Sequence, residues 1–134
     1  MAFSEEELRK NIPALPDFQS IEITQAEEGH VAFRFVPPAS VANFHGNMHG
    51  GLVYTLCEIA AGMTASTFGK NNVALNGSIN YLRRCELNKA LTVETDTSHN
   101  GRSTMVHHVR VIDEAEKLIA EANFTLFVLP NDNA

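Results

Sequence analysis

The sequence lacks the features that mark membrane-spanning and nucleic-acid-binding proteins. No apolar run approaches the roughly 18 residues needed for a bilayer span, because polar residues or glycine interrupt each one. The ten Lys and Arg residues are scattered, and a formal net charge of -6 leaves no basic excess for a phosphate backbone. We therefore expect neither a membrane segment nor a nucleic-acid partner.

Cysteine is scarce as well, with only Cys57 and Cys85. Their spacing matches no metal-binding motif, and two cysteines in such a chain are more often buried thiols than a disulfide. The N-terminal segment includes Glu5, Glu6 and Glu7 and lacks the charged-then-apolar layout of a secretory signal. These observations favour a cytoplasmic protein with no metal or other cofactor.

What the chain does contain is enough apolar material for one core. Its hydrophobic fraction of 44% and charged fraction of 19% are ordinary for a soluble protein and exclude intrinsic disorder. The 134 residues include no linker-like stretch, internal repeat or low-complexity segment. We expect a single domain spanning residues 1–134.

Two helices are predicted. Ser4 and Glu7 have the spacing of a capping box, which indicates a short helix over residues 5–11. Apolar side chains recur at three-to-four spacing over residues 50–68, and Gly69 is placed to end this second, long helix. The small side chains of the long helix should allow a neighbouring sheet to approach it closely.

Strand patterns lie on both sides of the long helix. Alternating residues predict two strands before it, over residues 18–24 and 31–35, joined by a turn at Glu28-Gly29. Four further runs follow it, at approximately residues 73–82, 91–98, 103–112 and 118–129. This order predicts an α+β fold in which an antiparallel sheet of about five to six strands curls around one buried helix.

The candidate chemistry is concentrated at the start of the long helix, where Asn43 precedes His49-Gly50-Gly51. A helix that begins at two glycines presents unpaired backbone amides at the positive end of its dipole. Because glycine has no side chain, a substrate carbonyl can approach those amides closely. The segment therefore predicts an oxyanion-binding site in which Gly50 and Gly51 contact the substrate.

Glu58 follows nine residues after His49 among apolar and small residues, and we expect its carboxylate to be buried. Two structural alternatives stay open: a solvent-facing position, or an ion pair with Arg83 or Arg84. Glu58 lies two to three turns beyond the helix start, too far to act on a carbonyl held there. A carboxylate from a neighbouring subunit could face that carbonyl, which favours a site shared between subunits.

The arrangement of Asn43, His49-Gly50-Gly51 and Glu58 resembles the PaaI-type acyl-CoA thioesterases of the hotdog superfamily. Residues 79–83 are similar to the strand that leads into an Arg-containing turn in that family, and Gly101-Arg102-Ser103 resembles its usual hairpin. The resemblance covers most of the chain. It implies the hotdog fold and the hydrolysis of acyl-CoA thioesters.

The resemblance also implies a role for each residue near the helix. Glu58 would act as general base or nucleophile, although relatives frequently carry Asp at this position. Gly50 and Asn43 of the partner subunit would stabilise the oxyanion. His49 would either hydrogen-bond within the site or brace the loop that precedes the helix.

Further substrate contacts are expected outside this helix. Some relatives orient the attacking water with Ser or Thr at the position of Ala74, where Asn76 or Ser78 would substitute. Guanidinium groups match phosphate oxygens, so the turns with arginine are candidates for binding coenzyme A. The residues concerned are Arg83, Arg84, Arg102 and Ser103.

Two other functions fit the same pattern. A hotdog dehydratase or hydratase would pair the helix carboxylate with a catalytic histidine, here His45 or His49. A non-catalytic acyl-CoA sensor would bind the thioester and control a separate effector. In each case the uncovered sheet edge of a hotdog protomer predicts a homodimer at least, and relatives favour a homotetramer. Coenzyme A would be part of the substrate.

Overall fold

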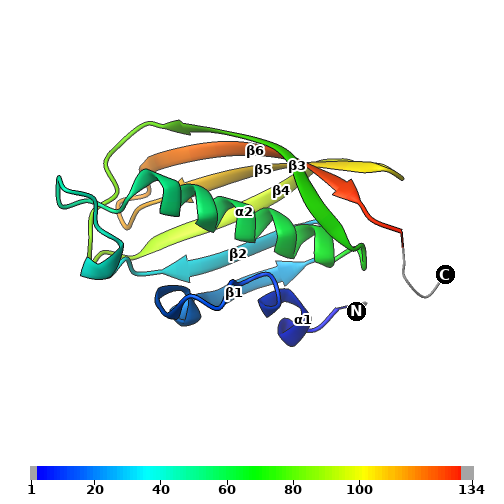
Figure 1. Cartoon of the computed structure of the whole chain (residues 1–134), viewed down its shortest axis with the longest axis horizontal. Helices are drawn as coiled ribbons and strands as arrows, with labels where there is room; N and C mark the ends of the chain where they lie inside the picture. Colours follow the sequence, from blue (N-terminus) through cyan, green and yellow to red (C-terminus); the bar gives the residue numbers. More distant parts are fainter. Residues whose placement is uncertain (1–2, 131–134) are drawn as a thin grey trace.

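A six-stranded antiparallel sheet curves around one long helix, α2 (Gly50–Ser66), in the computed structural model (Figure 1). The structure describes residues 3–130, so both ends of the predicted domain 1–134 lie outside the described residues. The strands are β1 (Glu22–Glu27), β2 (His30–Phe35), β3 (Asn72–Tyr81), β4 (Leu91–Asn100), β5 (Thr104–Ile112) and β6 (Leu118–Val128). Shorter helical segments are α1 (Glu5–Arg9) and the 3₁₀ turns η1 (Pro16–Ser20) and η2 (Ala39–Val41).

α2 fits inside the curved sheet because most of its side chains are small or apolar. Cys57 and Met63 are fully buried, as are three alanines of the same helix. Gly62 has no room for a side chain, since a Cβ there would lie 2.6 Å from Asn11 Oδ1. The helix ends before Gly69, whose φ of 71° suits glycine. Small residues thus let both the sheet and the N-terminal segment approach α2 closely.

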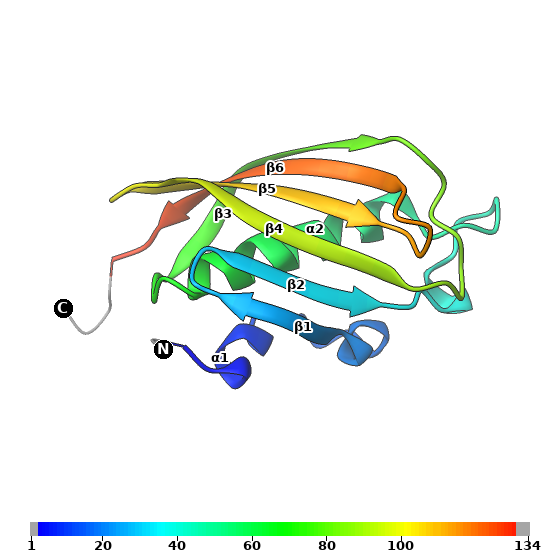
Figure 2. The ribbon, with the colours of Figure 1, turned by 180° about the vertical axis from the view of Figure 1, so that it is seen from behind.

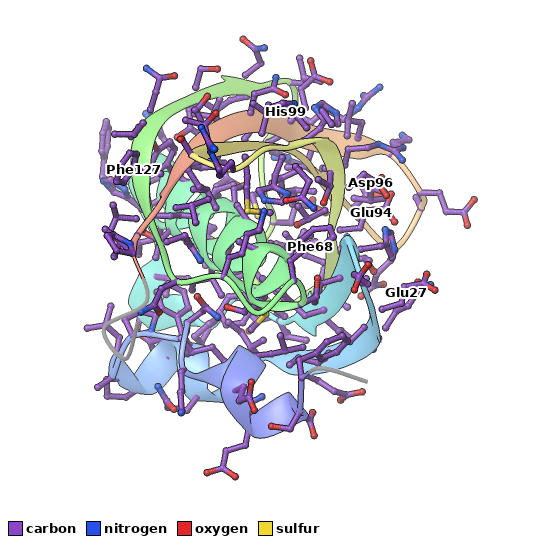
Figure 3. All side chains as sticks on the ribbon, turned by 90° about the vertical axis from the view of Figure 1, so that its right-hand side faces the viewer. Glu27, Phe68, Glu94, Asp96, His99 and Phe127 are labelled. Atoms are coloured by element: carbon purple, nitrogen blue, oxygen red, sulfur yellow. The ribbon has the colours of Figure 1, made fainter. Side chains whose placement is uncertain are left out.

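The sheet has the strand order β1-β2-β4-β5-β6-β3, which leaves β1 and β3 at its edges (Figure 2). Seen end-on, the sheet curls around α2, with Glu94 and Asp96 on its outer face (Figure 3). Arg110 pairs with Glu94 at 2.7 Å on that face. The β3 edge is more apolar, because Val73 and Leu75 are 47% and 59% exposed.

The predicted architecture is confirmed, with one element assigned wrongly. The strand expected over residues 18–24 begins only at Glu22, because residues 16–20 form η1. Pro16 fixes φ at the start of this turn, and the buried Phe18 and Ile21 lie three residues apart, on one side of a helical turn. The first helix is also shorter than predicted, although Ser4 Oγ accepts the Glu7 amide as expected.

Candidate active site

The start of α2 offers one unpaired backbone donor. His49 is the N-cap, and its Nδ1 accepts the Gly51 amide at 3.0 Å. The amides of Leu52 and Val53 both donate to the His49 carbonyl. Within residues 3–130, the Gly50 N–H donates no hydrogen bond. The free backbone donor at this end of the helix dipole is therefore the Gly50 amide, whereas the Gly51 amide is already occupied.

Asn43 organises the loop that leads to α2. Its Oδ1 accepts the amides of His45 and Asn47, at 3.0 and 3.1 Å, and its own amide donates to the Asn47 carbonyl. These bonds fix the carboxamide, and its Nδ2 makes no hydrogen bond to other described residues. Asn43 and Gly50 line the same pocket, which has a volume of about 220 Å³.

Arg83 and Arg84 line this pocket too, and both are exposed. Arg84 Nη2 contacts Glu86 Oε1 at 3.2 Å, on the surface. Neither arginine is paired with Glu58 within residues 3–130, which excludes the core ion pair that the sequence left open. Two guanidinium groups beside the Gly50 amide are suited to an anionic ligand.

Tyr81 is a pocket residue that sequence reasoning missed. Its hydroxyl donates to the Gly50 carbonyl at 2.7 Å, and it lines the pocket with Asn43. Gly77, Ile79 and Tyr81 alternate along β3, and Gly77 faces Tyr54 of α2. This alternation is the sequence signal that could have placed Tyr81 on the helix side of the strand.

Glu58 is exposed in the single chain, so the predicted burial of its carboxylate is wrong. Its neighbours in sequence, Leu56 and Ile59, are buried because they project from other sides of the helix. Glu58 lines a groove of about 520 Å³ between α2, the N-terminal segment and β3. Other lining residues include Thr55, Pro13, Leu15, Val73 and Ala74.

The Gly50 pocket and the Glu58 groove are separate places on one chain. Eight residues separate Gly50 from Glu58, which corresponds to about 12 Å along a helix axis. The Gly50 pocket and the Glu58 groove share no lining residue. One chain therefore carries two candidate half-sites, and it does not bring its own Glu58 to its own Gly50 amide.

Asn76 and Ser78 do not join either half-site, contrary to the prediction. They pair with Thr125 and Asn123 of β6, whereas Gly77 between them pairs with the buried Phe124 on the helix side. Their side chains consequently lie on the outer face of the sheet. A β-bulge between Ala74 and Asn76 reverses the alternation, so that Ala74 lines the Glu58 groove whereas Asn76 and Ser78 do not.

Arg102 and Ser103 lie at the opposite end of α2 from Gly50. Lys70, just beyond the C-terminus of α2, donates to the Gly101 carbonyl at 2.9 Å, which places the β4–β5 turn there. The single chain therefore does not bring Arg102 and Ser103 to the pocket that contains Arg83 and Arg84.

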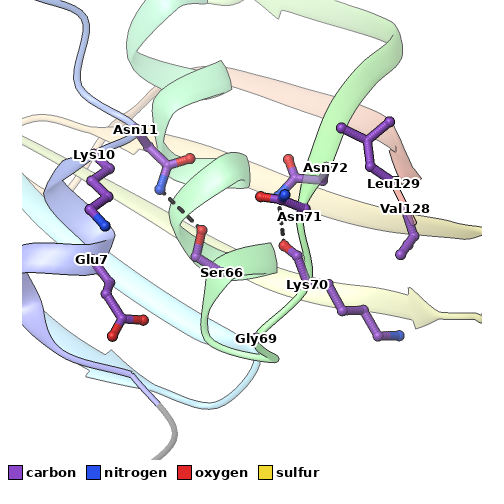
Figure 4. Close-up of a pocket in the computed structure, with 10 residues that line it drawn as sticks. All are labelled: Glu7, Lys10, Asn11, Ser66, Gly69, Lys70, Asn71, Asn72, Val128 and Leu129. Atoms are coloured by element: carbon purple, nitrogen blue, oxygen red, sulfur yellow. Dashed lines mark hydrogen bonds between the residues drawn. The ribbon is translucent and has the colours of Figure 1, made fainter. Parts of the chain in front are cut away.

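A larger pocket of about 690 Å³ lies beside this end of α2 (Figure 4). Two hydrogen bonds join residues that line it: Asn11 donates to Ser66 at 3.1 Å, and Asn72 donates to the Lys70 carbonyl at 3.2 Å. None of the predicted site residues lines it. This pocket therefore contains no residue to which we assign a catalytic or substrate-binding role.

Both cysteines are free and buried, as predicted. Burial raises the pKa of Cys57 to about 12 and that of Cys85 to about 11, so both thiols stay protonated at neutral pH. In residues 3–130, no group of three His, Cys, Asp or Glu side chains could hold a metal ion. No helix in the same range is long and apolar enough to cross a membrane.

Comparison with known proteins decides the family of the chain. The family model of the thioesterase superfamily matches residues 45–120, which include the start of α2, Glu58 and β3. The chain belongs to this superfamily. This match and the PaaI relative of Escherichia coli K12 together confirm the predicted class, a thioester hydrolase of the PaaI type.

Individual members of the superfamily are similar over most of the chain. A hypothetical thioesterase from Streptococcus pneumoniae TIGR4, solved with coenzyme A, is 31% identical with a TM-score of 0.87, over 96% of this chain and 98% of that one. A Streptococcus mutans UA159 protein bound to acetyl CoA is 31% identical with a TM-score of 0.83, over 90% and 97%. The acyl-coenzyme A thioesterase PaaI of Escherichia coli K12 is 26% identical over 75% of this chain and 71% of its own length. These likenesses confirm the hotdog fold.

Proposed function

We propose that the protein hydrolyses acyl-CoA thioesters to the free acid and coenzyme A. The observation that carries this proposal is the unpaired Gly50 amide, which shares a pocket with Asn43, Arg83 and Arg84. An amide at a helix N-terminus suits a developing oxyanion, and the arginines suit the phosphates of coenzyme A. The coenzyme A and acetyl CoA complexes of the streptococcal relatives support this substrate class.

The proposed reaction uses the two half-sites together. The Gly50 N–H and Asn43 Nδ2 would stabilise the oxygen of the thioester carbonyl as negative charge develops on it. Glu58 acts in one of two roles. As a general base it takes a proton from water while the water oxygen attacks the carbonyl carbon; as a nucleophile its carboxylate attacks directly and water hydrolyses the resulting anhydride. In either role the C–S bond breaks and coenzyme A leaves as the thiolate.

We further propose that the two half-sites come from two subunits. About 12 Å of helix separates Gly50 from Glu58 in one chain, whereas a two-fold partner can place its Glu58 opposite Gly50. The β3 edge supports this pairing, because it is unpaired and presents Val73 and Leu75 beside the Glu58 groove. The proposed minimum is a homodimer, and two such dimers would form the homotetramer.

His49 is better explained as a cap than as a catalytic residue. Its Nδ1 accepts the Gly51 amide, and neither His49 nor His45 lines the pocket that contains Gly50. His45 instead stacks on the exposed ring of Phe44, with 3.9 Å between the ring centroids. In the shared site proposed here, a dehydratase would need a histidine in the Gly50 pocket that the partner's carboxylate faces. Neither histidine lines that pocket, so the arrangement favours hydrolysis.

Release of free thiol tests the proposed function directly. We expect the purified protein to release coenzyme A with turnover from at least one class in a panel of short, long and aromatic acyl-CoAs. The 2-enoyl-CoAs that correspond to the short and long aliphatic members of the panel are also tested for hydration. Stoichiometric binding of acyl-CoA without thiol release would favour a sensor, and hydration without thiol release would favour a hydratase.

Mixed dimers test the shared site. We expect Glu58→Gln and Asn43→Ala chains, each inactive alone, to recover activity when they are refolded together. A heterodimer then has one intact site and one site lacking both groups, so a 1:1 mixture should reach about a quarter of wild-type activity. Mixing Glu58→Gln with the double variant carrying both changes is the matched control, because no intact site can form. Equal activity in the two mixtures would contradict a composite site.

A further inference from the structure

Tyr81 connects the last residue of β3 to the first turn of α2. Its hydroxyl donates to the Gly50 carbonyl at 2.7 Å. Its ring covers the space where Gly50 would carry a side chain, since a Cβ there would lie 3.3 Å from Tyr81 Cζ. Tyr81 thus holds the residue whose N–H is the unpaired donor, through a hydrogen bond and a ring contact together.

The sheet side of this connection is firmly anchored. Tyr81 pairs with Ala120 of β6, and the amides of Leu82 and Arg83 both donate to the Ile119 carbonyl. Ile119 and Ala120 are buried in the core. The tyrosine hydroxyl therefore projects toward α2 from a fixed position on the sheet.

The helix side needs such an anchor. Glycine has the widest range of backbone conformations, and the first turn of a helix has the fewest hydrogen bonds to restrain it. The Gly50 N–H belongs to the His49–Gly50 peptide, whose carbonyl accepts the amides of Leu52 and Val53. Tyr81 restrains the peptide on the other side of the Gly50 Cα, through the Gly50 carbonyl. With both peptides held, the Gly50 N–H keeps its direction toward the pocket. A donor that stabilises an oxyanion contributes most when its direction is set before the charge develops.

We propose that Tyr81 is a positioning residue that fixes the direction of the Gly50 N–H toward the thioester oxygen. This inference rests on the proposed thioesterase function. It assigns Tyr81 no contact with the reacting atoms, only with the backbone that contacts them. It also gives the glycine at position 50 a role besides substrate access, because a Cβ there would lie 3.3 Å from Tyr81 Cζ and the ring would have to shift to accommodate it.

The Tyr81 hydroxyl is suited to a permanent donor role. Partial burial raises its pKa above the ordinary value of 10.0, and the neighbouring Cys57 and Tyr54 raise it further. The hydroxyl therefore keeps its proton over the whole neutral range, and the bond to Gly50 should not change the pH dependence of hydrolysis there.

Tyr81→Phe removes the hydroxyl and keeps the ring. We expect kcat to fall about tenfold, with KM within about twofold of wild type, because only a transition-state interaction is weakened. The fall should be equal for short, long and aromatic acyl-CoAs, since all form the same oxyanion. Tyr54→Phe is the matched control: Tyr54 is the other tyrosine of the chain, it packs on Phe124, and it should keep wild-type kinetics.

Three kinetic results would overturn the inference. They are a kcat within twofold of wild type, a change confined to KM, or a loss confined to one acyl class, which would make Tyr81 a wall of the acyl pocket. A readout independent of activity is the ¹⁵N order parameter of Gly50, which should fall in Tyr81→Phe while that of Gly62 stays unchanged. If the wild type releases no thiol, the proposed function fails, and an unchanged Gly50 order parameter separately refutes the positioning role.

Discussion

Replacing Glu58 by glutamine should lower the turnover of acyl-CoA hydrolysis by at least ~100-fold, the scale expected for loss of a general base. The amide has nearly the shape of the carboxylate, but it neither accepts a proton at neutral pH nor attacks a carbonyl carbon. The measurement is thiol release under saturating acyl-CoA. KM should change little, because Arg83, Arg84 and the Gly50 pocket are untouched.

The exposure of Glu58 makes this variant a clean test. The carboxylate forms no ion pair within residues 3–130, so its loss leaves no buried charge without a partner. The variant should therefore unfold at nearly the wild-type temperature. Glu28→Gln, an exposed glutamate in the β1–β2 turn, is the matched control and should keep full turnover.

Glu58→Asp separates position from charge. The shorter side chain withdraws the carboxylate by more than about 1 Å, and such a displacement alone reduces catalysis. We expect activity between that of wild type and that of Glu58→Gln. Unchanged turnover in Glu58→Gln would remove Glu58 from the mechanism, and the groove that it lines would then need another explanation.

The parts of the fold that were predicted correctly are those with a long, regular pattern. The seventeen residues of α2 repeat the three-to-four spacing of apolar side chains over more than two turns. The long strands β3 to β6 repeat the two-residue alternation of a strand more than twice. The 3₁₀ turn at residues 16–20 has only five residues, and its apolar residues fit a strand as well as a turn. Its assignment depended on Phe18 packing against Phe35, at 5.6 Å between ring centroids, which is a tertiary contact.

The residues of the candidate site also divide into those that local sequence patterns predicted and those that such patterns missed or misplaced. The glycine pair, Asn43 and Glu58 were found because helix chemistry is local in sequence. Asn76 and Ser78 were misplaced because a single extra residue, the bulge at Leu75, reverses which face the following side chains occupy. Tyr81 was missed because its bond to Gly50 joins residues 31 apart in sequence. A contact between residues so far apart in sequence depends on the packing of β3 against α2, which a local sequence pattern does not indicate.

His107 should make the protein unstable in mild acid. It is fully buried on β5, where its Nδ1 lies 3.2 Å from Thr97 Oγ1 and its Nε2 has no partner in the described residues. Thr97 Oγ1 donates its proton to the Gly29 carbonyl, so it accepts one from Nδ1. The neutral imidazole is thereby satisfied at Nδ1, and a second proton would sit on Nε2 without an acceptor.

The size and direction of this effect follow from the pKa. Burial lowers the pKa of His107 from its ordinary 6.5 to about 4. Between these values the unfolded chain binds a proton that the folded chain does not, so stability is complete above pH 6.5 and falls as the pH drops toward 4. The full loss corresponds to about 3 kcal/mol in the free energy of unfolding. That is a large share of the stability of a small domain.

His107→Gln isolates this contribution, because glutamine keeps a polar group beside Thr97 but does not titrate. We expect urea unfolding at pH 7 and pH 4.5, at one protein concentration, to show a pH dependence about 2 kcal/mol smaller than in wild type. The absolute stability of the variant does not enter this comparison, since only the difference between the two pH values counts. His99→Gln changes an exposed histidine of the neighbouring strand and is the matched control, which should keep the wild-type difference. If His107→Gln and wild type lose the same free energy between pH 7 and pH 4.5, the acid sensitivity belongs to other groups, and a proton reaches His107 without disturbing the core.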